Sequence, residues 1–312
     1  MKKPEEGKTN DYNQPLNRET PDEEIIDNGA IGNCNIVYKP SLIGRIARWL
    51  IPMLQRVMPF RLFKMVYDFL YVFYTKAIHI SYYRCVLMAK LFGDMNDAIR
   101  ASLTFKLLPY TMGGPKALEN AFAITALVEQ KKIEGALVEC GVAKGGTAAM
   151  MALTNREIGS VVRQKWFFDS FEGLPEPTDD DYKNGKAGHF VRPLQKGDCL
   201  GTIEQVSKLF FELLGFPRNE VHLVKGWFQD TVPAHKDKIG QIAVLRLDGD
   251  WYESTKIPLE NFYDEINTGG YVIIDDYATC FGSRKATDEF RAARNITSIL
   301  HPDGRGGAWF EK

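Results

Sequence analysis

The sequence has few cysteines, and no two of them form a CxxC pair. The total of five is odd and the residues are widely spaced, so neither a disulfide framework nor a zinc-finger site is predicted. Cys140 stands inside an apolar run and is interpreted as a small buried hydrophobic residue. No signal-peptide pattern is found, so a reducing, cytoplasmic setting is expected.

A strong charge, a long apolar run and the common nucleotide motifs are also missing. A net charge of −1 over 312 residues gives no indication of a nucleic-acid partner. No uncharged apolar stretch approaches the roughly 18 residues that span a bilayer. Neither GxGxxG nor GxxxxGK[ST] occurs, which disfavours NAD and a P-loop. The length accommodates one large α/β domain and an appended helical region.

The amino-terminal third divides into two segments of different composition. Residues 1–28 are polar and charged, so a disordered tail is predicted. Residues 29–109 contain long helical patterns rich in aromatic residues. Between residues 41 and 90, eight Arg or Lys stand against one Asp, a local balance of +7. We expect this extension to pack on the rest of the chain, to close over a substrate or to form a subunit contact. Peripheral contact with an anionic membrane through residues 41–90 is the alternative.

Residues 110–312 alternate between strand and helix patterns. This alternation predicts an α/β fold with a mainly parallel sheet covered by helices on both faces. Residues 174–200 form a Pro-, Gly- and Asp-rich insertion, and an irregular loop of this length is usually functional. The strands are predicted at residues 136–142, 165–169, 221–225, 242–247 and 271–274, with helices at residues 117–131, 145–156 and 202–214.

Two of these predicted strands end in pairs of carboxylates. Asp248 and Asp250 follow the fourth strand, and Asp275 and Asp276 follow the fifth. In an open α/β sheet, ligands bind beyond the carboxyl ends of the strands, so neighbouring strands would bring all four together. Like charges repel unless a cation lies among them, and oxygen ligands favour a hard ion such as Mg²⁺. The alternative is that these residues cap a helix and occupy a turn.

A glycine-rich turn follows the first predicted strand. Its pattern is ExGxxxGG, from Glu139 to Gly146, and Asp169 ends the next strand. Glycines allow close approach of a ligand, a helix amino terminus binds anions, and a carboxylate at the second strand end can accept ribose hydroxyls. A tight turn with Asp169 capping a loop is the alternative. The candidate cofactor-binding residues are Glu139, Gly141, Gly145, Gly146, Asp169 and Ser170.

Several segments resemble the macrocin O-methyltransferase (TylF-type) family of class I, S-adenosylmethionine-dependent sugar methyltransferases. The most specific are DSFEGLP at residues 169–175, LRLDGDWYEST at residues 245–255 and GGYVIIDDY at residues 269–277. The similarity covers residues 110–312, whereas no family motif is found before about residue 105. The resemblance implies a Rossmann-like class I methyltransferase fold with S-adenosylmethionine as cofactor.

The resemblance also implies roles for the acidic strand ends. It places a metal on Asp248, Asp275 and Asp276 and makes Asp250 the general base, in agreement with the independent interpretation of the strand ends. The acceptor is then expected to be a sugar hydroxyl on a small molecule, and the protein a homo-oligomer. Two alternatives stay open at this point: a catechol-like diol as acceptor, and a non-catalytic, membrane-associated binding protein.

Four further residues are weaker candidates for the site. Trp227, Trp251 and Tyr277 either face the sulfonium cation or belong to the core. His189, in the insertion, is an alternative base or an exposed loop histidine.

Overall fold

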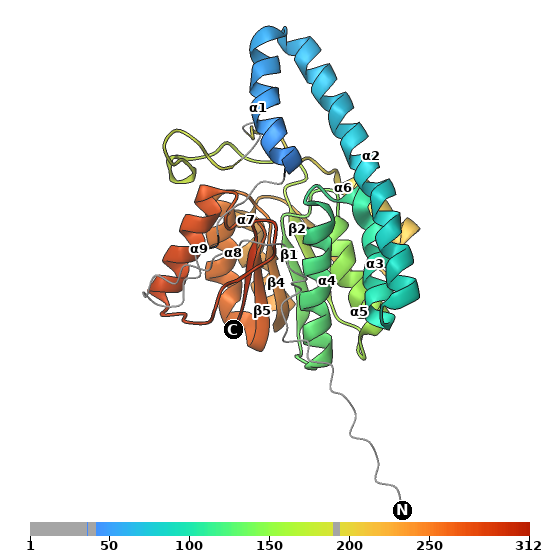
Figure 1. The fold of residues 1–312 in the computed structure, drawn as a ribbon. Coiled ribbons are helices and arrows are strands. Elements are labelled where there is room, and N and C mark those ends of the chain that lie inside the picture. Colours follow the sequence, from blue (N-terminus) through green and yellow to red (C-terminus); the bar gives the residue numbers. More distant parts are fainter. Residues whose placement is uncertain (1–35, 37–41, 190–193) are drawn as a thin grey trace, which may run out of the picture.

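The computed structural model describes residues 36, 42–189 and 194–312, and the predicted tail at residues 1–28 lies outside them. Figure 1 shows a layered α/β body from which a helical hairpin projects. The predicted fold class, a mainly parallel sheet between helices with a helical extension before it, is confirmed.

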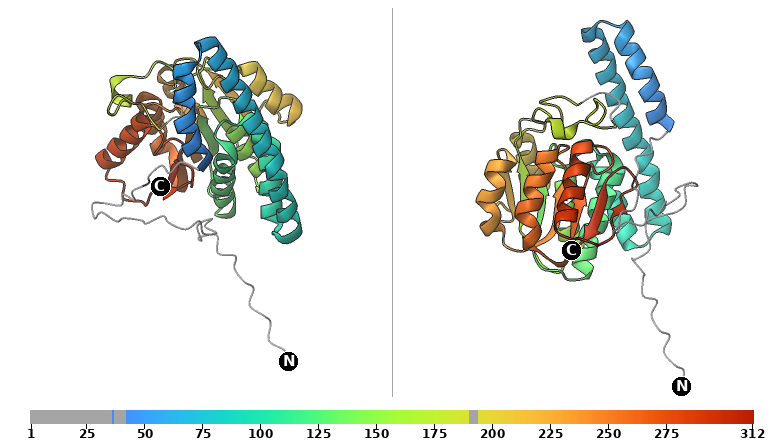
Figure 2. Two further views of the ribbon diagram at one scale, coloured as in Figure 1. Left: turned by 45° about the horizontal axis from the view of Figure 1, so that its top comes forward. Right: turned by 90° about the vertical axis from the view of Figure 1, so that its left-hand side faces the viewer.

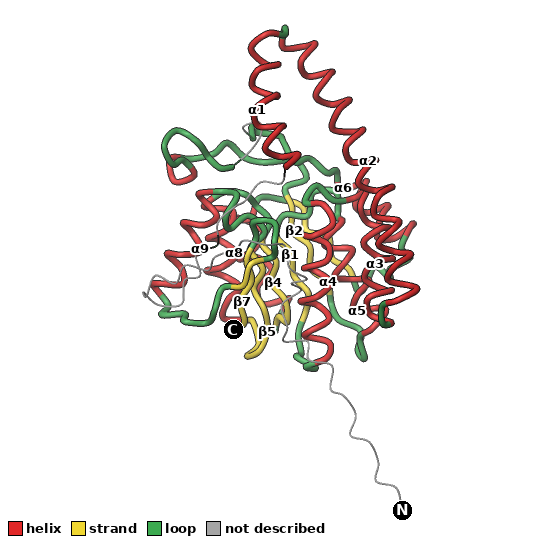
Figure 3. Tube along the Cα trace, in the orientation of Figure 1, coloured by secondary structure: helices red, strands yellow, loops and turns green. Residues whose placement is uncertain are grey.

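The centre of the body is one sheet, to which seven strands of the described chain contribute in the order β3-β2-β1-β4-β5-β7-β6. The first five strands are parallel, β7 pairs antiparallel with β5, and β6 pairs antiparallel with β7 at the edge. Figure 3 shows the strands between helices. The strands are β1 (Ala136–Cys140), β2 (Lys165–Asp169), β3 (Val221–Lys225), β4 (Ile242–Leu247), β5 (Ile266–Ile274), β6 (His301–Pro302) and β7 (Ala308–Glu311).

Strand register brings the acidic strand ends together. β1 and β4 are buried along their whole length, as expected for parallel strands covered on both faces. Cys140 pairs with Leu247, and Leu247 pairs with Ile274, so these three neighbouring strands end at one level. The residues that follow β4 and β5 therefore start from adjacent positions at the same edge of the sheet.

Helices cover both faces of the sheet and enclose two hydrophobic clusters. One face carries α3, α4, α5 and the α6 segment, and the other carries α7, α8 and α9 (Figures 1 and 2). The helices are α3 (Met95–Leu107), α4 (Gly114–Gln130), α5 (Gly146–Ile158), α6 (Ile203–Ser207), α7 (Phe228–Ile239), α8 (Tyr252–Phe262) and α9 (Phe281–Ala293), with short helical turns at Leu108–Tyr110, Asp179–Asp181 and Tyr263–Glu265.

The predicted helix at residues 202–214 is interrupted. It begins as α6, where Thr202 and Gln205 form a capping box, and continues as a π-helical segment over Lys208–Leu213. The apolar spacing was sufficient to predict a helix, but the wider turn follows from packing, since Leu209 and Phe210 are both buried in the core.

The extension is a hairpin of two helices, α1 (Leu42–Val57) and α2 (Phe60–Phe92). At 1.5 Å per residue, the 33 residues of α2 extend over about 50 Å. The carboxyl-terminal part of α2 packs on α3 through Tyr82, Val86 and Ala101, while the hairpin tip projects beyond the body in Figure 1 and in the right view of Figure 2. None of the described helices is long and apolar enough to cross a bilayer.

Candidate active site

A cavity of about 990 Å³ opens at the carboxyl ends of the parallel strands. Its floor is made by the turns after β1, β2, β4 and β5, and residues of the insertion line one side. A further wall comes from α2, which contributes Tyr67, Asp68 and Tyr71. Sequence patterns alone did not assign these three residues to the site, because the pairing of a helix with a distant cleft is a property of the folded chain.

Gly141 allows the ends of β1 and β4 to touch. Its φ of +97° is in the left-handed region, and a Cβ atom there would lie 1.9 Å from the carbonyl oxygen of Asp248. Gly141 and Gly146 both line the cavity. Gly145, also left-handed, precedes α5 and packs toward Leu209 on the far side of the turn, so it shapes the turn rather than the cavity surface.

Asp169 ties the end of β2 to the glycine-rich turn. Its Oδ2 accepts hydrogen bonds from the backbone N–H groups of Val142 (2.7 Å) and Ala143 (2.8 Å), and its Oδ1 accepts one from Phe171 (2.6 Å). Burial raises the pKa of Asp169 although these three donors oppose the rise. Ser170 follows in the cavity wall, where its hydroxyl donates to the carbonyl oxygen of Gly173 at 3.0 Å.

Glu139 lies one layer behind the cavity wall. Its Oε1 accepts hydrogen bonds from the hydroxyl of Thr147 (2.6 Å) and from Nη1 of Arg246 (2.7 Å), and the side chain is fully buried. Burial raises its pKa to about 8, although Arg246 acts in the opposite direction. The predicted cofactor residue therefore holds Arg246 and the start of α5 in place, without a surface of its own on the cavity.

The four predicted aspartates do converge, and all of them line the cavity. One oxygen each from Asp248, Asp275 and Asp276 lies within 4.8 Å of the other two. Thr279 donates to Oδ1 of Asp276 at 2.9 Å, whereas Oδ2 of Asp276 is buried and has no hydrogen-bond partner among the described residues. A buried carboxylate oxygen without a donor is costly unless a cation or a proton satisfies it.

Two arginines that the motifs did not reveal accompany these carboxylates. Arg246, in the buried interior of β4, contacts Asp275 and donates to Asp248 at 2.8 Å. Arg305, in the loop between β6 and β7, also contacts Asp275. Burial opposes ionisation of Asp275, but Arg305 and Arg246 outweigh it and lower the pKa of this carboxyl. An arginine inside a largely apolar strand, such as Arg246, is a sequence signal for buried acidic partners. The sequence around Arg305 carries no comparable signal.

Negative charge exceeds positive charge in this cluster. Six carboxylates, from Glu139, the four aspartates and Asp303, share the guanidinium groups of Arg246 and Arg305, which leaves −4 if every group is ionised. Burial together with the neighbouring carboxylates raises the pKa of Asp276 and Asp248, and raises that of Asp250 to about 7. The site thus has a shortage of cations, which a divalent ion would relieve.

Asp250 occupies a strained position beside the other aspartates. Its φ is +60°, unusual for a residue with a side chain, and it is 9% exposed. The thiol of Cys280 donates to its Oδ1 at 3.5 Å. Strained backbone at a cavity is a common feature of functional sites, and here it aims a carboxylate at the cleft.

The weaker candidates separate into two groups. Trp227, Trp251 and His189 line the cavity, and the His189 ring packs edge-on against Phe281 at 5.1 Å. Tyr277 belongs to the core, where its hydroxyl donates to Asp288 at 2.6 Å, so it does not face the cavity.

Comparison with known proteins identifies the family. The profile of the Macrocin-O-methyltransferase (TylF) family matches residues 53–312. The chain belongs to this family. The match begins well before residue 110. The family similarity therefore extends further toward the amino terminus than the range of residues 110–312 that the motifs indicated. As a member, the protein is an S-adenosylmethionine-dependent O-methyltransferase, as the resemblance predicted.

This chain shares moderate sequence identity with curated relatives. The chain is 35% identical over 203 residues to demethyldecarbamoylnovobiocin O-methyltransferase of Streptomyces niveus, covering 65% of this chain and 76% of the relative. It is 37% identical over 201 residues to 8-demethyl-8-(2,3-dimethoxy-alpha-L-rhamnosyl)-tetracenomycin-C 4'-O-methyltransferase of Streptomyces olivaceus, covering 64% and 75%. The solved O-methyltransferase NovP is similar in structure, with a TM-score of 0.58, 35% identity, and coverage of 65% of this chain and 82% of NovP.

Proposed function

We propose that the protein transfers a methyl group from S-adenosylmethionine to a hydroxyl of a sugar or glycosylated small molecule, with a divalent cation such as Mg²⁺ in the site. The observation that carries this proposal is the convergence of Asp248, Asp275 and Asp276 on the cavity that the glycine-rich turn also lines. The name of the tetracenomycin relative, which specifies a rhamnosyl group and a 4'-O position, supports a sugar hydroxyl as acceptor.

The donor set fits a hard cation. Asp248, Asp275 and Asp276 would hold it through carboxylate oxygens, and Oδ2 of Asp276 is already free of a protein donor among the described residues. When bound, such a cation lowers the pKa of a hydroxyl that contacts it and fixes the orientation of that hydroxyl. Arg246 and Arg305 both form ion pairs with Asp275 and hold its carboxylate in position.

The turn after β1 is the proposed place of the cofactor. Gly141 and Gly146 expose backbone to the cavity at the amino terminus of α5, which suits a carboxylate group. A carboxylate offers about four lone-pair sites, and Asp169 uses three of them on backbone N–H groups. The Ser170 side chain also hydrogen-bonds to this carboxylate, and both residues line the cavity, so a ribose hydroxyl bound there would take the place of the Ser170 donor. Glu139 and Gly145 support this surface from the interior.

Asp250 is the proposed general base. The hydroxyl oxygen attacks the methyl carbon, the electrons of the carbon–sulfur bond return to sulfur as S-adenosylhomocysteine forms, and the hydroxyl proton passes to Asp250. A base with a pKa near neutrality can accept this proton and release it to water afterwards. Because the sulfonium is a good leaving group, positioning and deprotonation supply the catalysis and no covalent enzyme intermediate is needed.

The acceptor is proposed to lie between the aspartates and α2. Tyr67 and Tyr71 offer aromatic surface, and Asp68 offers a hydrogen-bond acceptor, at the wall that the hairpin adds to the cavity. This arrangement suits a glycoside, which presents both ring faces and hydroxyls. A catechol-like diol would use the same aspartates, so comparison of the two acceptor classes is part of the test.

We propose further that the hairpin contacts an anionic membrane surface. Ile46, Trp49, Met53 and Val57 are exposed and spaced three or four residues apart, so they share one face of α1. Residues 41–90 carry a balance of +7, whereas a second copy of the same hairpin would oppose like charges. The predicted homo-oligomer and the predicted cytoplasmic setting are compatible with this contact.

The test of the proposed reaction is methyl transfer to glycosides and to catechols, with Mg²⁺ or with a chelator. We expect turnover on glycosides that requires the cation, and a loss of about 100-fold or more in kcat for Asp250→Asn with S-adenosylmethionine affinity unchanged. Asp237→Asn, an exposed change on α7, is the matched control. Full activity in chelator would remove the cation from the proposal, and full activity of Asp250→Asn would place the base elsewhere.

A further inference from the structure

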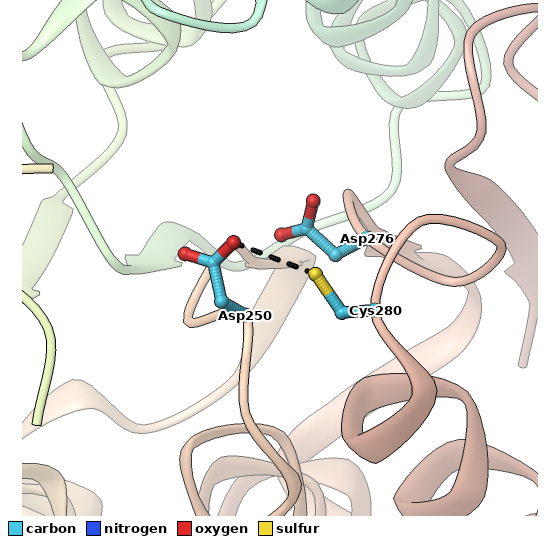
Figure 4. Close-up of side chains that lie close together, drawn as sticks. All are labelled: Asp250, Asp276 and Cys280. Atoms are coloured by element: carbon cyan, nitrogen blue, oxygen red, sulfur yellow. Dashed lines mark hydrogen bonds between the residues drawn. The ribbon is translucent and has the colours of Figure 1, made fainter. Parts of the chain in front are cut away.

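Asp276 belongs to two clusters of metal-ligating side chains. Besides the cluster with Asp248 and Asp275, it lies with Asp250 and Cys280 such that one ligand atom from each is within 4.8 Å of the others. These three residues are all buried, at 6%, 9% and 1% exposure. Figure 4 shows the two carboxylates and the thiol directed toward a common space.

A second observation indicates a ligand at this place. Oδ2 of Asp276 is buried and has no hydrogen-bond partner among the described residues. Cys280 is the residue before α9, where a serine or threonine would cap the helix, yet its side chain makes no capping bond. Its sulfur instead faces Oδ1 of Asp250 at 3.5 Å. Local structure therefore leaves Oδ2 of Asp276 without a donor, and the Cys280 thiol has only its weak contacts with Asp250 and with the hydroxyl of Thr279 (3.9 Å).

The geometry suits a tetrahedral ion with mixed ligands. Zinc binds cysteine sulfur at about 2.3 Å and carboxylate oxygen at about 2.0 Å, and at a tetrahedral angle these lengths place sulfur and oxygen about 3.5 Å apart. The sulfur of Cys280 and Oδ1 of Asp250 are 3.5 Å apart. Mg²⁺ has little affinity for sulfur, so Cys280 distinguishes this cluster from the all-oxygen cluster beside it.

We propose that Asp250, Asp276 and Cys280 form a second cation site, which takes Zn²⁺ or a similar thiophilic ion and blocks turnover. Binding replaces the thiol proton with the metal, and the proton leaves to solvent. The bound ion occupies the carboxylate of Asp250 and draws Asp276 from the neighbouring cluster. The inhibitory effect rests on the proposed function, because it requires Asp250 to be the base, whereas the binding itself does not.

The binding test uses Co²⁺ alone as a spectroscopic probe of the purified full chain under anaerobic conditions. Thiolate ligation gives an ultraviolet charge-transfer band, which we expect in the unaltered protein and not in Cys280→Ser. Cys199→Ser is the matched control, because Cys199 also lines the cavity but is not part of the cluster, and it should retain the band. No band in the unaltered protein, or an undiminished band in Cys280→Ser, would overturn the proposal.

Two further measurements keep the result unambiguous. Circular dichroism checks that Cys280→Ser is folded, and if it is not, Cys280→Ala and Asp276→Asn replace it with the same expected loss of the band. In turnover with Mg²⁺, the unaltered protein should be inhibited by Zn²⁺ at concentrations at least about tenfold lower than Cys280→Ser, which lacks one of three ligands. A cobalt band in a protein whose turnover ignores Mg²⁺ would support this site and contradict the proposed function.

Discussion

Four aspartates at the ends of β4 and β5 differ in what surrounds them. Asp275 contacts two arginines and its pKa is lowered, whereas Asp276 has one oxygen without a donor among the described residues and its pKa is raised. Asp250 faces a thiol, and burial together with Asp248 raises its pKa to about 7. Identical side chains thus differ in their surroundings: two arginines fix Asp275, Asp276 has an oxygen that a cation could satisfy, and Asp250 is suited to the proposed role of base.

These surroundings predict a pH dependence of stability in metal-free protein. The pKa of Asp250 is about 7 in the folded chain, against about 3.9 unfolded. The folded chain binds this proton more tightly, so the free energy of unfolding falls as pH rises from about 4 to about 7. Asp250→Asn should remove part of this fall, up to about 4 kcal/mol.

Chemical denaturation in chelator near pH 4.5, low in this window, and near pH 7.5, above it, measures most of the difference. Asp237→Asn, on the exposed side of α7, should leave the fall as it is in the unaltered protein. An equal fall in the Asp250→Asn protein would show that this carboxyl titrates normally.

Among single residues, the sequence predicted the acidic cluster but not the arginines that pair with it. Asp248, Asp250, Asp275 and Asp276 could be found because parallel strands end at one edge of a sheet. Arg305 could not, because a loop residue between two short edge strands contacts Asp275 only after the chain folds. The burial of Glu139 likewise depends on Arg246 from a different strand.

Among the elements, the contact between the ends of β1 and β4 positions both halves of the site. The cofactor turn follows β1 and the first acidic pair follows β4, and Gly141 lets the two turns touch. The separation of the proposed cofactor turn from the proposed base, Asp250, is therefore set where the ends of β1 and β4 meet.

We predict that Gly141→Ala destabilises the protein more than Gly185→Ala does. Both glycines have a left-handed φ, but a Cβ at Gly185 meets nothing within 4 Å, whereas one at Gly141 would lie 1.9 Å from the carbonyl oxygen of Asp248. Gly185→Ala should cost about 1 kcal/mol through backbone strain alone. Thermal unfolding of the two variants measures the difference, and equal midpoints would mean that the strand ends separate freely.

Elements with strong patterns were predicted well. The fully buried strands β1, β2 and β4 were found within two residues, because buried parallel strands are nearly continuous apolar runs. The two-residue edge strand β6 and the strand β7 beside it were missed, since their pairing depends on neighbours and not on composition.

In the whole molecule, charge is distributed unevenly between the hairpin and the body. Residues 41–90 hold +7 while the full chain is −1, and of the remaining −8, residues 1–40 hold −3 and residues 91–312 hold −5. An anionic surface would attract the hairpin and repel the body, which orients the protein. The helix α3, which precedes the predicted boundary at residue 110, packs on α4 and α5, which follow it.

We predict binding to vesicles that contain phosphatidylglycerol and little binding to phosphatidylcholine alone, in co-sedimentation at low salt. Trp49, 70% exposed on α1, should insert its ring, so Trp49→Ser weakens binding, and added salt should weaken it further. Ile299→Ser, an exposed apolar change on the body, is the control. No vesicle binding, together with a dimer that Trp49→Ser dissociates, would assign the hairpin to a second copy of the chain.

The fold class was predictable from the alternation of strands and helices, as was the family from its motifs. The position of α2 against the cavity was not, because neither its aromatic pattern nor its charge specifies which surface of the body it crosses. The packing of α2 beside the cavity is a long-range contact that is seen only in the folded structure.

The most direct test of the central claim is a crystal structure of the protein with Mn²⁺ and S-adenosylhomocysteine, with anomalous diffraction locating the metal. The account predicts an anomalous peak in contact with oxygens of Asp248, Asp275 and Asp276, in the same cavity as the ligand and beside Asp250. An ordered ligand with the manganese bound elsewhere, or with no manganese near these aspartates, would contradict it.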